Sequence, residues 1–406
     1  MKCIHCAKDS NYKTRNSGNG KCGSCSRRFA FEPKSDRPKV TDMQFKRAIE
    51  DASAKGRLFF TERQLWYALN ARLGSGATSI VTPIVFLIVF AVIGAGALFV
   101  SGGDFEVLPL VGIALIGAIC FAIAILVRLA RRRGPPRLTL DLQPFRDSYL
   151  RRWVAAHDPV ERLLDPPADP RFRTTFGKGA ARPEPDLTAY SFDRALVTDT
   201  AAIAAVLVAN NFHFENNCAI LSLDGYPHAI ADTVRAMLRR NPRLTVFAVH
   251  DASPRGCALP LELRQNGWFP DPSITIVDLG LRPRQAWALR LFQLTAQATR
   301  LPTDLKARIG SDEIAWLESG RLCELAAVRP VRLMRAIFQG FAAARQANQG
   351  AAPGQGGQQA AAGAAGGAAG SSSSSSSSSG SGGAEFSSDT WADDAGADNA
   401  ASDSFG

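Results

Sequence analysis

Two long apolar runs stand out in the pattern of hydrophobic and polar positions. Residues 80–100 and 107–127 are each 21 residues long and contain no charged side chain. At ~1.5 Å per residue, a helix of this length spans about 31 Å, close to the ~30 Å hydrocarbon core of a bilayer. The short connection, residues 101–106, favours an antiparallel arrangement. The pattern therefore predicts a two-helix transmembrane hairpin over residues 80–127, with a pair of buried core helices as the alternative.

The charges beside these runs predict how the hairpin is oriented. The connection carries Asp104 and Glu106 and no basic residue, whereas Arg72 and Arg128 lie on the outer flanks, the latter followed by residues 131–133, all arginine. Because basic residues gather on the cytoplasmic side, both termini are expected in the cytoplasm. We therefore expect a protein of the cell (inner) membrane with two spans, whose first partner is the lipid bilayer.

Shorter elements are predicted on both sides of the hairpin. Thr41 with Gln44 and Thr61 with Gln64 have capping-box spacing, so residues 38–74 are expected to form a helical, winged-helix-like segment with helices at 42–54 and 62–73. Arginine and proline are frequent after the second span, so residues 128–190 are expected to form a basic juxtamembrane connector with one helix near 144–156.

An alternating pattern follows in residues 191–345. Strands are predicted at 194–198, 219–223, 244–250 and 274–279, and helices near 200–210, 228–240, 258–266, 283–299, 303–308, 311–325 and 330–348. Strands that alternate with helices indicate a parallel sheet covered on both faces. The expected fold class is therefore a membrane-anchored α/β protein.

The C-terminal residues 346–406 differ in composition. They contain alanine, glycine and glutamine repeats and nine consecutive serines, and they lack the large apolar residues of a core. We expect a disordered low-complexity acidic tail. Its aromatic residues Phe386, Trp391 and Phe405 allow the tail to recruit an unknown protein partner.

Cysteine spacing points to a metal site. Cys3 and Cys6 form one C-x2-C pair, Cys22 and Cys25 form a second, and 15 residues separate the pairs. Two such pairs suit a tetrahedral Zn²⁺ ion held by four thiolates, which is a structural and not a catalytic arrangement. The sequence therefore predicts a zinc ribbon over residues 1–37. A redox dithiol is the alternative.

Net charge bears on the partners. The chain carries a formal charge of +10, although the tail after Arg345 contains acidic residues and no basic one. The remaining body is strongly basic, which suits an anionic lipid surface or a nucleic acid. Both partners stay open at this point.

Each predicted strand ends in or near an aspartate: Asp199, Asp224, Asp251 and Asp278. Because ligands of open parallel sheets bind at the carboxyl ends of the strands, such residues can hold Mg²⁺. The competing interpretation is that they cap helices and turns.

Two blocks of sequence resemble one known family. One is Asp224-Gly225-Tyr226-Pro227 followed by the hydrophobic strand 246–250 and the segment Asp251-Ala252-Ser253-Pro254-Arg255-Gly256; the other is Thr61-Glu62-Arg63-Gln64-Leu65-Trp66-Tyr67. Together they are similar to the A subunit of DNA topoisomerase VI, which has a Toprim domain.

The resemblance implies a Toprim-like fold for residues 191–345. It also implies that Tyr67 is at the position of the DNA-cleaving tyrosine, and that Asp199 and Asp251 are at positions that bind Mg²⁺. The chain departs from the family pattern at Ser253, where the family has a second aspartate, and at Asp199, where it has glutamate. Losing one carboxylate weakens a Mg²⁺ site.

These observations favour a zinc-ribbon protein whose Toprim-like domain is not an active enzyme. It would be a binding or regulatory module with nucleic acid as a candidate ligand. The alternatives are a Mg²⁺-dependent DNA-cleaving enzyme that uses Tyr67, and a protein-interaction scaffold that uses the acidic tail.

Overall fold

The computed structural model describes residues 1–74, 135–166, 192–227, 244–265, 268 and 274–350. The chain divides into two compact units, and each is assembled from separate stretches of sequence. The first unit comprises residues 1–182, 251–254 and 281–331, and the second comprises residues 183–250, 255–280 and 332–406. The described parts of the two units are considered separately below.

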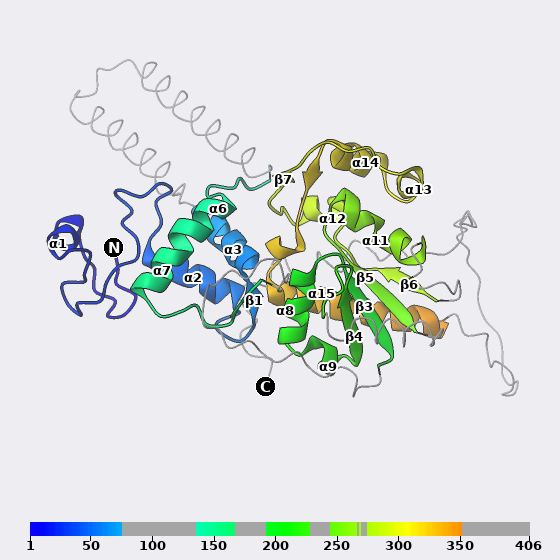
Figure 1. Ribbon diagram of the computed structural model, residues 1–406, viewed down its shortest axis with the longest axis horizontal. Coiled ribbons are helices and arrows are strands. Elements are labelled where there is room, and N and C mark those ends of the chain that lie inside the picture. The colour runs from blue at the N-terminus through cyan, green and yellow to red at the C-terminus, as the bar shows by residue number, and fades with distance from the viewer. Residues whose placement is uncertain (75–134, 167–191, 228–243, 266–267, 269–273, 351–406) are drawn as a thin grey trace, which may run out of the picture. The chain divides into compact units, whose positions relative to one another are not determined.

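Short helices and two-residue strands make up the first unit (Figure 1). Its elements before residue 182 are α1 (Tyr12–Ser17), α2 (Asp42–Ala52), β1 (Phe60–Thr61), α3 (Glu62–Gly74), α6 (Leu142–Pro144), the π-helix η1 (Phe145–Leu150), α7 (Arg151–Ala156) and β2 (Leu163–Leu164). Its later elements are α12 (Pro283–Ala288), β7 (Leu294–Thr295), α13 (Thr303–Lys306), α14 (Ser311–Glu318), β8 (Arg321–Leu322) and the 3-10 helix η3 (Leu325–Ala327).

Aromatic side chains form the core of this unit. The ring of Phe45 from α2 stacks on Trp153 from α7 at 4.7 Å between centroids, and Phe31 lies 5.3 Å from Phe45. Phe31, Phe45 and Phe145 are essentially inaccessible to solvent. Each buried aromatic side chain removes a large apolar area from water, so this cluster stabilises the packing of α2 against α7.

Buried polar groups fix α3 to the chain that precedes α6. The side-chain amide of Asn70 donates to the carbonyl of Leu140 and accepts from the backbone N–H groups of Thr139 and Leu140. The indole of Trp66 donates to the same carbonyl at 2.7 Å. Because Asn70 is fully buried, these bonds satisfy groups that would otherwise be costly to bury.

Both predicted capping boxes are present. Thr41 accepts from the backbone N–H of Gln44, whose side chain accepts from the backbone of Thr41, and Thr61 and Gln64 repeat this arrangement at the start of α3. The predicted helices at 42–54 and 62–73 are therefore confirmed, within two residues at each end.

A four-stranded parallel sheet is the centre of the second unit. Its strands are β3 (Arg194–Thr198), β4 (Cys218–Ser222), β5 (Thr245–Val249) and β6 (Ile276–Asp278), and they lie in the order β4-β3-β5-β6. Its helices are α8 (Ala201–Ala209), α9 (Phe212–Glu215), α11 (Pro254–Gln265) and α15 (Pro330–Gly350), of which the ends of α11 and α15 extend into the first unit. The predicted parallel sheet is confirmed.

Helices cover both faces of this sheet. Leu259 and Leu263 of α11 pack with the side chains of alternate strand residues, among them Val197 and Val246. On the opposite face, the ring of Phe341 in α15 lies 4.5 Å from that of Phe247. Side chains alternate between the faces of a strand, so a sheet covered on both sides requires apolar residues at successive positions. The strands meet this requirement.

Two predicted helices are shorter than expected. The helix predicted at 311–325 is α14, which ends at Glu318 and is followed by β8 and η3. Residues 283–299 were expected to be helical, but α12 ends at Ala288 and Arg290 has a φ of 52°. A left-handed residue cannot continue a right-handed helix, and the chain then extends into β7. The strand β7 pairs with β8, whose residues are more than 25 positions later.

The prediction of a membrane-anchored fold needs correction. Within residues 1–74, 135–166 and the later described stretches, no helix is both long enough and apolar enough to cross a membrane. The longest, α15, carries Arg332 and Arg335, and the apolar α8 has 9 residues. The predicted spans 80–100 and 107–127 lie outside the described residues. A two-span protein of the cell membrane is therefore not supported, and the fold class of the described residues is α/β.

Other predictions also fall outside the described residues. They concern the helix near 228–240, about half of the connector 128–190 and nearly all of the tail 346–406. The helix predicted near 144–156 lies within the described half and is confirmed as α6, η1 and α7.

Candidate metal centre and tyrosine site

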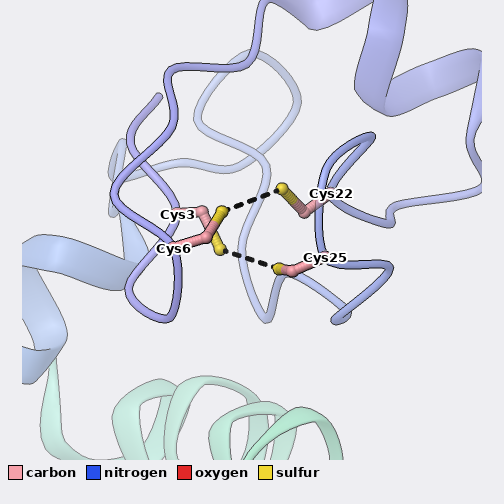
Figure 2. A group of neighbouring side chains, drawn as sticks. All are labelled: Cys3, Cys6, Cys22 and Cys25. Carbon is pink, nitrogen blue, oxygen red and sulfur yellow. Dashed lines mark hydrogen bonds between the residues drawn. The ribbon is translucent and has the colours of Figure 1, made fainter.

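The four paired cysteines come together in the first unit (Figure 2). Their sulfur atoms all lie within 4.8 Å of one another, with Cys3 and Cys25 at 3.7 Å and Cys6 and Cys22 at 3.6 Å. A disulfide needs about 2.05 Å between its sulfurs, so these thiols are free. The predicted cysteine site is confirmed as a group that can hold a metal ion.

Two equivalent turns present these sulfurs. In the first, the backbone N–H of Cys3 donates to Lys8 and that of Ala7 donates back to Cys3; in the second, Cys22 bonds to Arg27 and Ser26 to Cys22 in the same way. The residue after each second cysteine is left-handed, with φ of 58° at Ala7 and 59° at Ser26. The repeated geometry directs two pairs of sulfurs at one point.

Local hydrogen bonds favour a thiolate at Cys22. The backbone N–H groups of Cys25 and Ser24 donate to its sulfur and lower the pKa of the Cys22 thiol to about 6. Thiolates are the form that binds metals. In the same turn, burial and hydrogen bonds to the other three cysteines raise the pKa of the Cys25 thiol to about 11, so Cys22 is the cysteine that ionises more readily.

A partly buried ion pair holds the helix between the two turns. Arg15 of α1 donates to both carboxylate oxygens of Glu32, at 2.8 and 2.9 Å, and also to the backbone carbonyl of Ser10. A bidentate pair of this kind has a fixed geometry. The two turns are thereby joined by structure as well as by sequence.

Tyr67 lies in a second polar cluster of the first unit. Its hydroxyl donates to Glu324 at 3.1 Å, and the other oxygen of Glu324 pairs with Arg63, one turn before Tyr67 on α3. Asp251 accepts a hydrogen bond from the backbone N–H of Leu325 at 2.6 Å. Three segments that are far apart in sequence therefore meet around this tyrosine.

The environment of Tyr67 opposes ionisation. The side chain is 2% exposed, and burial, followed by the negative charges of Glu324 and Asp251, raises the pKa of the phenol far above its ordinary value. The same surroundings raise the pKa of Cys323 to about 12 through burial and the charges of Asp251 and Glu324. In this arrangement, Tyr67 is a neutral hydrogen-bond donor.

The predicted Mg²⁺ residues belong to different compact units. Asp251 belongs to the first, whereas Asp199, at the end of β3, belongs to the second, where its backbone N–H donates to Val249. In the described part of the chain, neither belongs to a group of three or more ligands close enough to share an ion. The backbone N–H of Ser253, the residue that stands where the family has a second aspartate, donates a hydrogen bond to the carbonyl of Asp251.

Sequence reasoning did not find Glu324. It is 257 residues from Tyr67, and no motif marks it. Arg63 was within the quoted Thr61–Tyr67 motif, and its position one helical turn before Tyr67 was the available signal.

Comparisons with protein-family models, with curated proteins and with solved structures found no match to this chain. The resemblance to DNA topoisomerase VI therefore rests on the motifs around Tyr67 and Asp251.

Proposed function

We propose that this chain is a nucleic-acid-binding protein whose N-terminal ribbon is held by structural zinc and whose Toprim-like domain does not cleave DNA. The observation that carries this proposal is the surface around the four cysteines. Six basic side chains of the ribbon are exposed: Lys2, Lys8, Lys13, Lys21, Arg27 and Arg28. Asp9 is the one acidic residue among the first 28 positions.

Zinc is the ion that suits the cysteine geometry. A Zn–S bond of about 2.3 Å in a tetrahedral site places neighbouring sulfurs about 3.8 Å apart. The separations of 3.6 Å for Cys6–Cys22 and 3.7 Å for Cys3–Cys25 are close to that value. Four thiolates leave no open coordination position, so the ion would stabilise the ribbon and take no part in a reaction.

The charge of the ribbon favours a polyanionic ligand. A zinc ion with four thiolates has a net charge of −2. The positive charge of the exposed lysines and arginines is larger than this, so the ribbon stays basic. Basic residues on a small rigid module contact phosphates and release counterions, which makes binding sensitive to salt. This combination supports nucleic acid as the ligand class.

The surroundings of Tyr67 support binding without cleavage. A nucleophilic phenol must reach a phosphate and lose its proton. Tyr67 is buried, donates a hydrogen bond to Glu324 and has a raised pKa. Without a rearrangement around Glu324, this tyrosine would not act on DNA.

A Mg²⁺-dependent DNA-cleaving enzyme is the second candidate, and one observation favours it. Arg63, Tyr67 and Asp251 lie in one electrostatic neighbourhood, since the charge of Asp251 acts on both other residues. An arginine and an acidic residue near a tyrosine are the groups that phosphoryl transfer needs. The two candidate functions differ in whether the Tyr67 hydroxyl attacks a DNA phosphate.

A binding and cleavage assay on the full chain separates them. Labelled single-stranded and duplex DNA would be titrated with zinc-loaded protein at several salt concentrations, with and without Mg²⁺. We expect binding that weakens steeply with salt and no strand breakage. Mg²⁺-dependent cleavage with covalent adducts that disappear in Tyr67→Phe would establish the second candidate and overturn the first.

Charge variants test the binding surface. The double variant Lys8→Glu/Lys21→Glu should weaken binding about tenfold or more and reduce the salt slope. Lys8→Arg/Lys21→Arg, which keeps both charges at the same sites, is the matched control and should bind like the unmodified chain. Equal affinity of the two double variants would remove the ribbon from the proposed interface.

A further inference from the structure

Two histidines meet beside the cysteine ribbon, at the end of α7. Nε2 of His5, which lies between Cys3 and Cys6 in the sequence, is 3.4 Å from Nδ1 of His157, a residue 152 positions later. Both residues belong to the first unit. The imidazole of His5 is exposed, whereas the side chain of His157 is 5% exposed.

The separation of the two nitrogens fits a shared metal ion. Metal–nitrogen bonds of about 2.0–2.1 Å in a tetrahedral site place two ligand nitrogens about 3.3 Å apart. Hydrogen bonds that involve an N–H donor cluster at about 2.9–3.0 Å. The observed 3.4 Å is thus closer to the edge of a coordination tetrahedron than to a typical hydrogen bond.

A carboxylate orients the buried imidazole. Nε2 of His157 is 2.9 Å from Oδ2 of Asp42, which is fully buried and also accepts from the backbone N–H groups of Ala30 and Phe31. In neutral His157, the proton therefore resides on Nε2 and the lone pair of Nδ1 points towards His5. Metal-bound histidines are typically supported by a carboxylate in this way.

Water completes the coordination. Among the described residues, no third His, Cys, Asp or Glu side chain lies close enough to both imidazoles to share an ion with them. Because His5 is open to solvent, water can occupy the remaining positions.

We propose that His5 and His157 form a second cation site, distinct from the four cysteines and suited to a borderline transition metal such as Zn²⁺ or Co²⁺. Imidazole ligands select ions of this kind over Mg²⁺ and Ca²⁺. The bound ion would link the first cysteine turn to the end of α7. This site does not depend on the proposed nucleic-acid function.

Metal stoichiometry tests the proposal. Untagged full-length protein, stripped of metal under reducing conditions, would be titrated with Co²⁺ while bound metal and thiolate-to-cobalt charge-transfer absorption are recorded. We expect two equivalents per chain in the unmodified protein and one in His5→Gln, whose charge-transfer absorption is unchanged because it reports the cysteine site. Lys2→Ala, an exposed change in the same turn, should retain two equivalents.

Two outcomes would overturn the proposal. One equivalent in the unmodified protein would mean that the histidines share a hydrogen bond only. Two equivalents in His5→Gln would place the second ion elsewhere. The charge-transfer absorption shows in every case whether the variant still folds around its cysteines.

Discussion

At the end of β5, the imidazole of His250 lies where a side chain on Gly280 would begin. A Cβ atom built on Gly280 would overlap this ring, which is fully buried and 3.0 Å from a carboxylate oxygen of Asp278. The backbone N–H of Gly280 donates to the same oxygen at 2.9 Å. Any residue larger than glycine at position 280 would therefore clash with the His250 ring.

We expect Gly280→Ala to lower the free energy of unfolding of the second unit by about 1–3 kcal/mol, the usual cost of overpacking a core. Chemical denaturation followed by circular dichroism measures this change. Gly74→Ala is the control, because an added Cβ there would meet its nearest atom at an ordinary 3.9 Å. Equal stability of the two variants would mean that His250 can move aside at little cost.

The hydrogen bond between Tyr67 and Glu324 makes a second prediction. A double-mutant cycle of Tyr67→Phe and Glu324→Gln should give a coupling free energy of about 1.5–3 kcal/mol, since a hydrogen bond to a charged group is worth roughly that much. Equilibrium unfolding of the four proteins supplies the values. Strictly additive effects would show that the hydroxyl and the carboxylate do not interact.

These residues also show where sequence reasoning ends. The cysteine site was predictable because two short motifs fix four ligands, and Tyr67 and Asp251 were identified from local motifs. Glu324 was not, since its role depends on a contact across 257 positions. The burial of Tyr67 was also not predictable, because the pattern of an amphipathic helix does not show which other segment covers its side chains.

At the scale of elements, the main strands were predicted to within about two residues. In runs such as Arg194–Thr198, the central residues are aliphatic and the residues at both ends are polar. The two-residue strands β2, β7 and β8 were missed, because they pair with residues more than 25 positions away and carry no periodic pattern of their own. Long-range pairing, and not local propensity, defines these short elements.

The link between α1 and the segment after the second cysteine turn predicts a pH dependence. Arg15 donates to Glu32 and lowers its pKa. A depressed folded-state pKa contributes stability above the unfolded value of about 4.3, and this contribution is lost as pH falls through the folded value. We therefore expect Glu32→Gln to be less stable than the unmodified chain at neutral pH.

The difference between the two proteins should shrink as the pH falls below the unfolded value of about 4.3, and should vanish once the pH is below the lowered folded-state pKa of Glu32. Thermal unfolding at a series of pH values measures it, and each pH compares the two proteins under the same metal occupancy. A difference that stays constant with pH would mean that the ion pair contributes no pH-dependent stability.

For the whole molecule, the two units predict an uneven response to metal removal. All four cysteines belong to the first unit, whereas the β3–β6 sheet belongs to the second. We expect chelation to increase amide hydrogen exchange in α1 and α2 and to leave β3 and β5 protected, because metal binding contributes folding energy where its ligands lie. Returning Zn²⁺ should restore protection in α1 and α2.

Cys22→Ser should produce the same exchange pattern without a chelator. Loss of protection in β3 and β5 after either treatment would show that the metal stabilises both units, against this expectation.

The interleaving of the two units also sets an order of events during synthesis. Residues 281–331 complete the first unit, so its N-terminal elements leave the ribosome long before Glu324 can reach Arg63 and Tyr67. Domains generally fold as units during synthesis. A nascent chain that already carries its cysteine ribbon must therefore wait, with α3 lacking its later partners, until Glu324, 257 positions after Tyr67, has been translated.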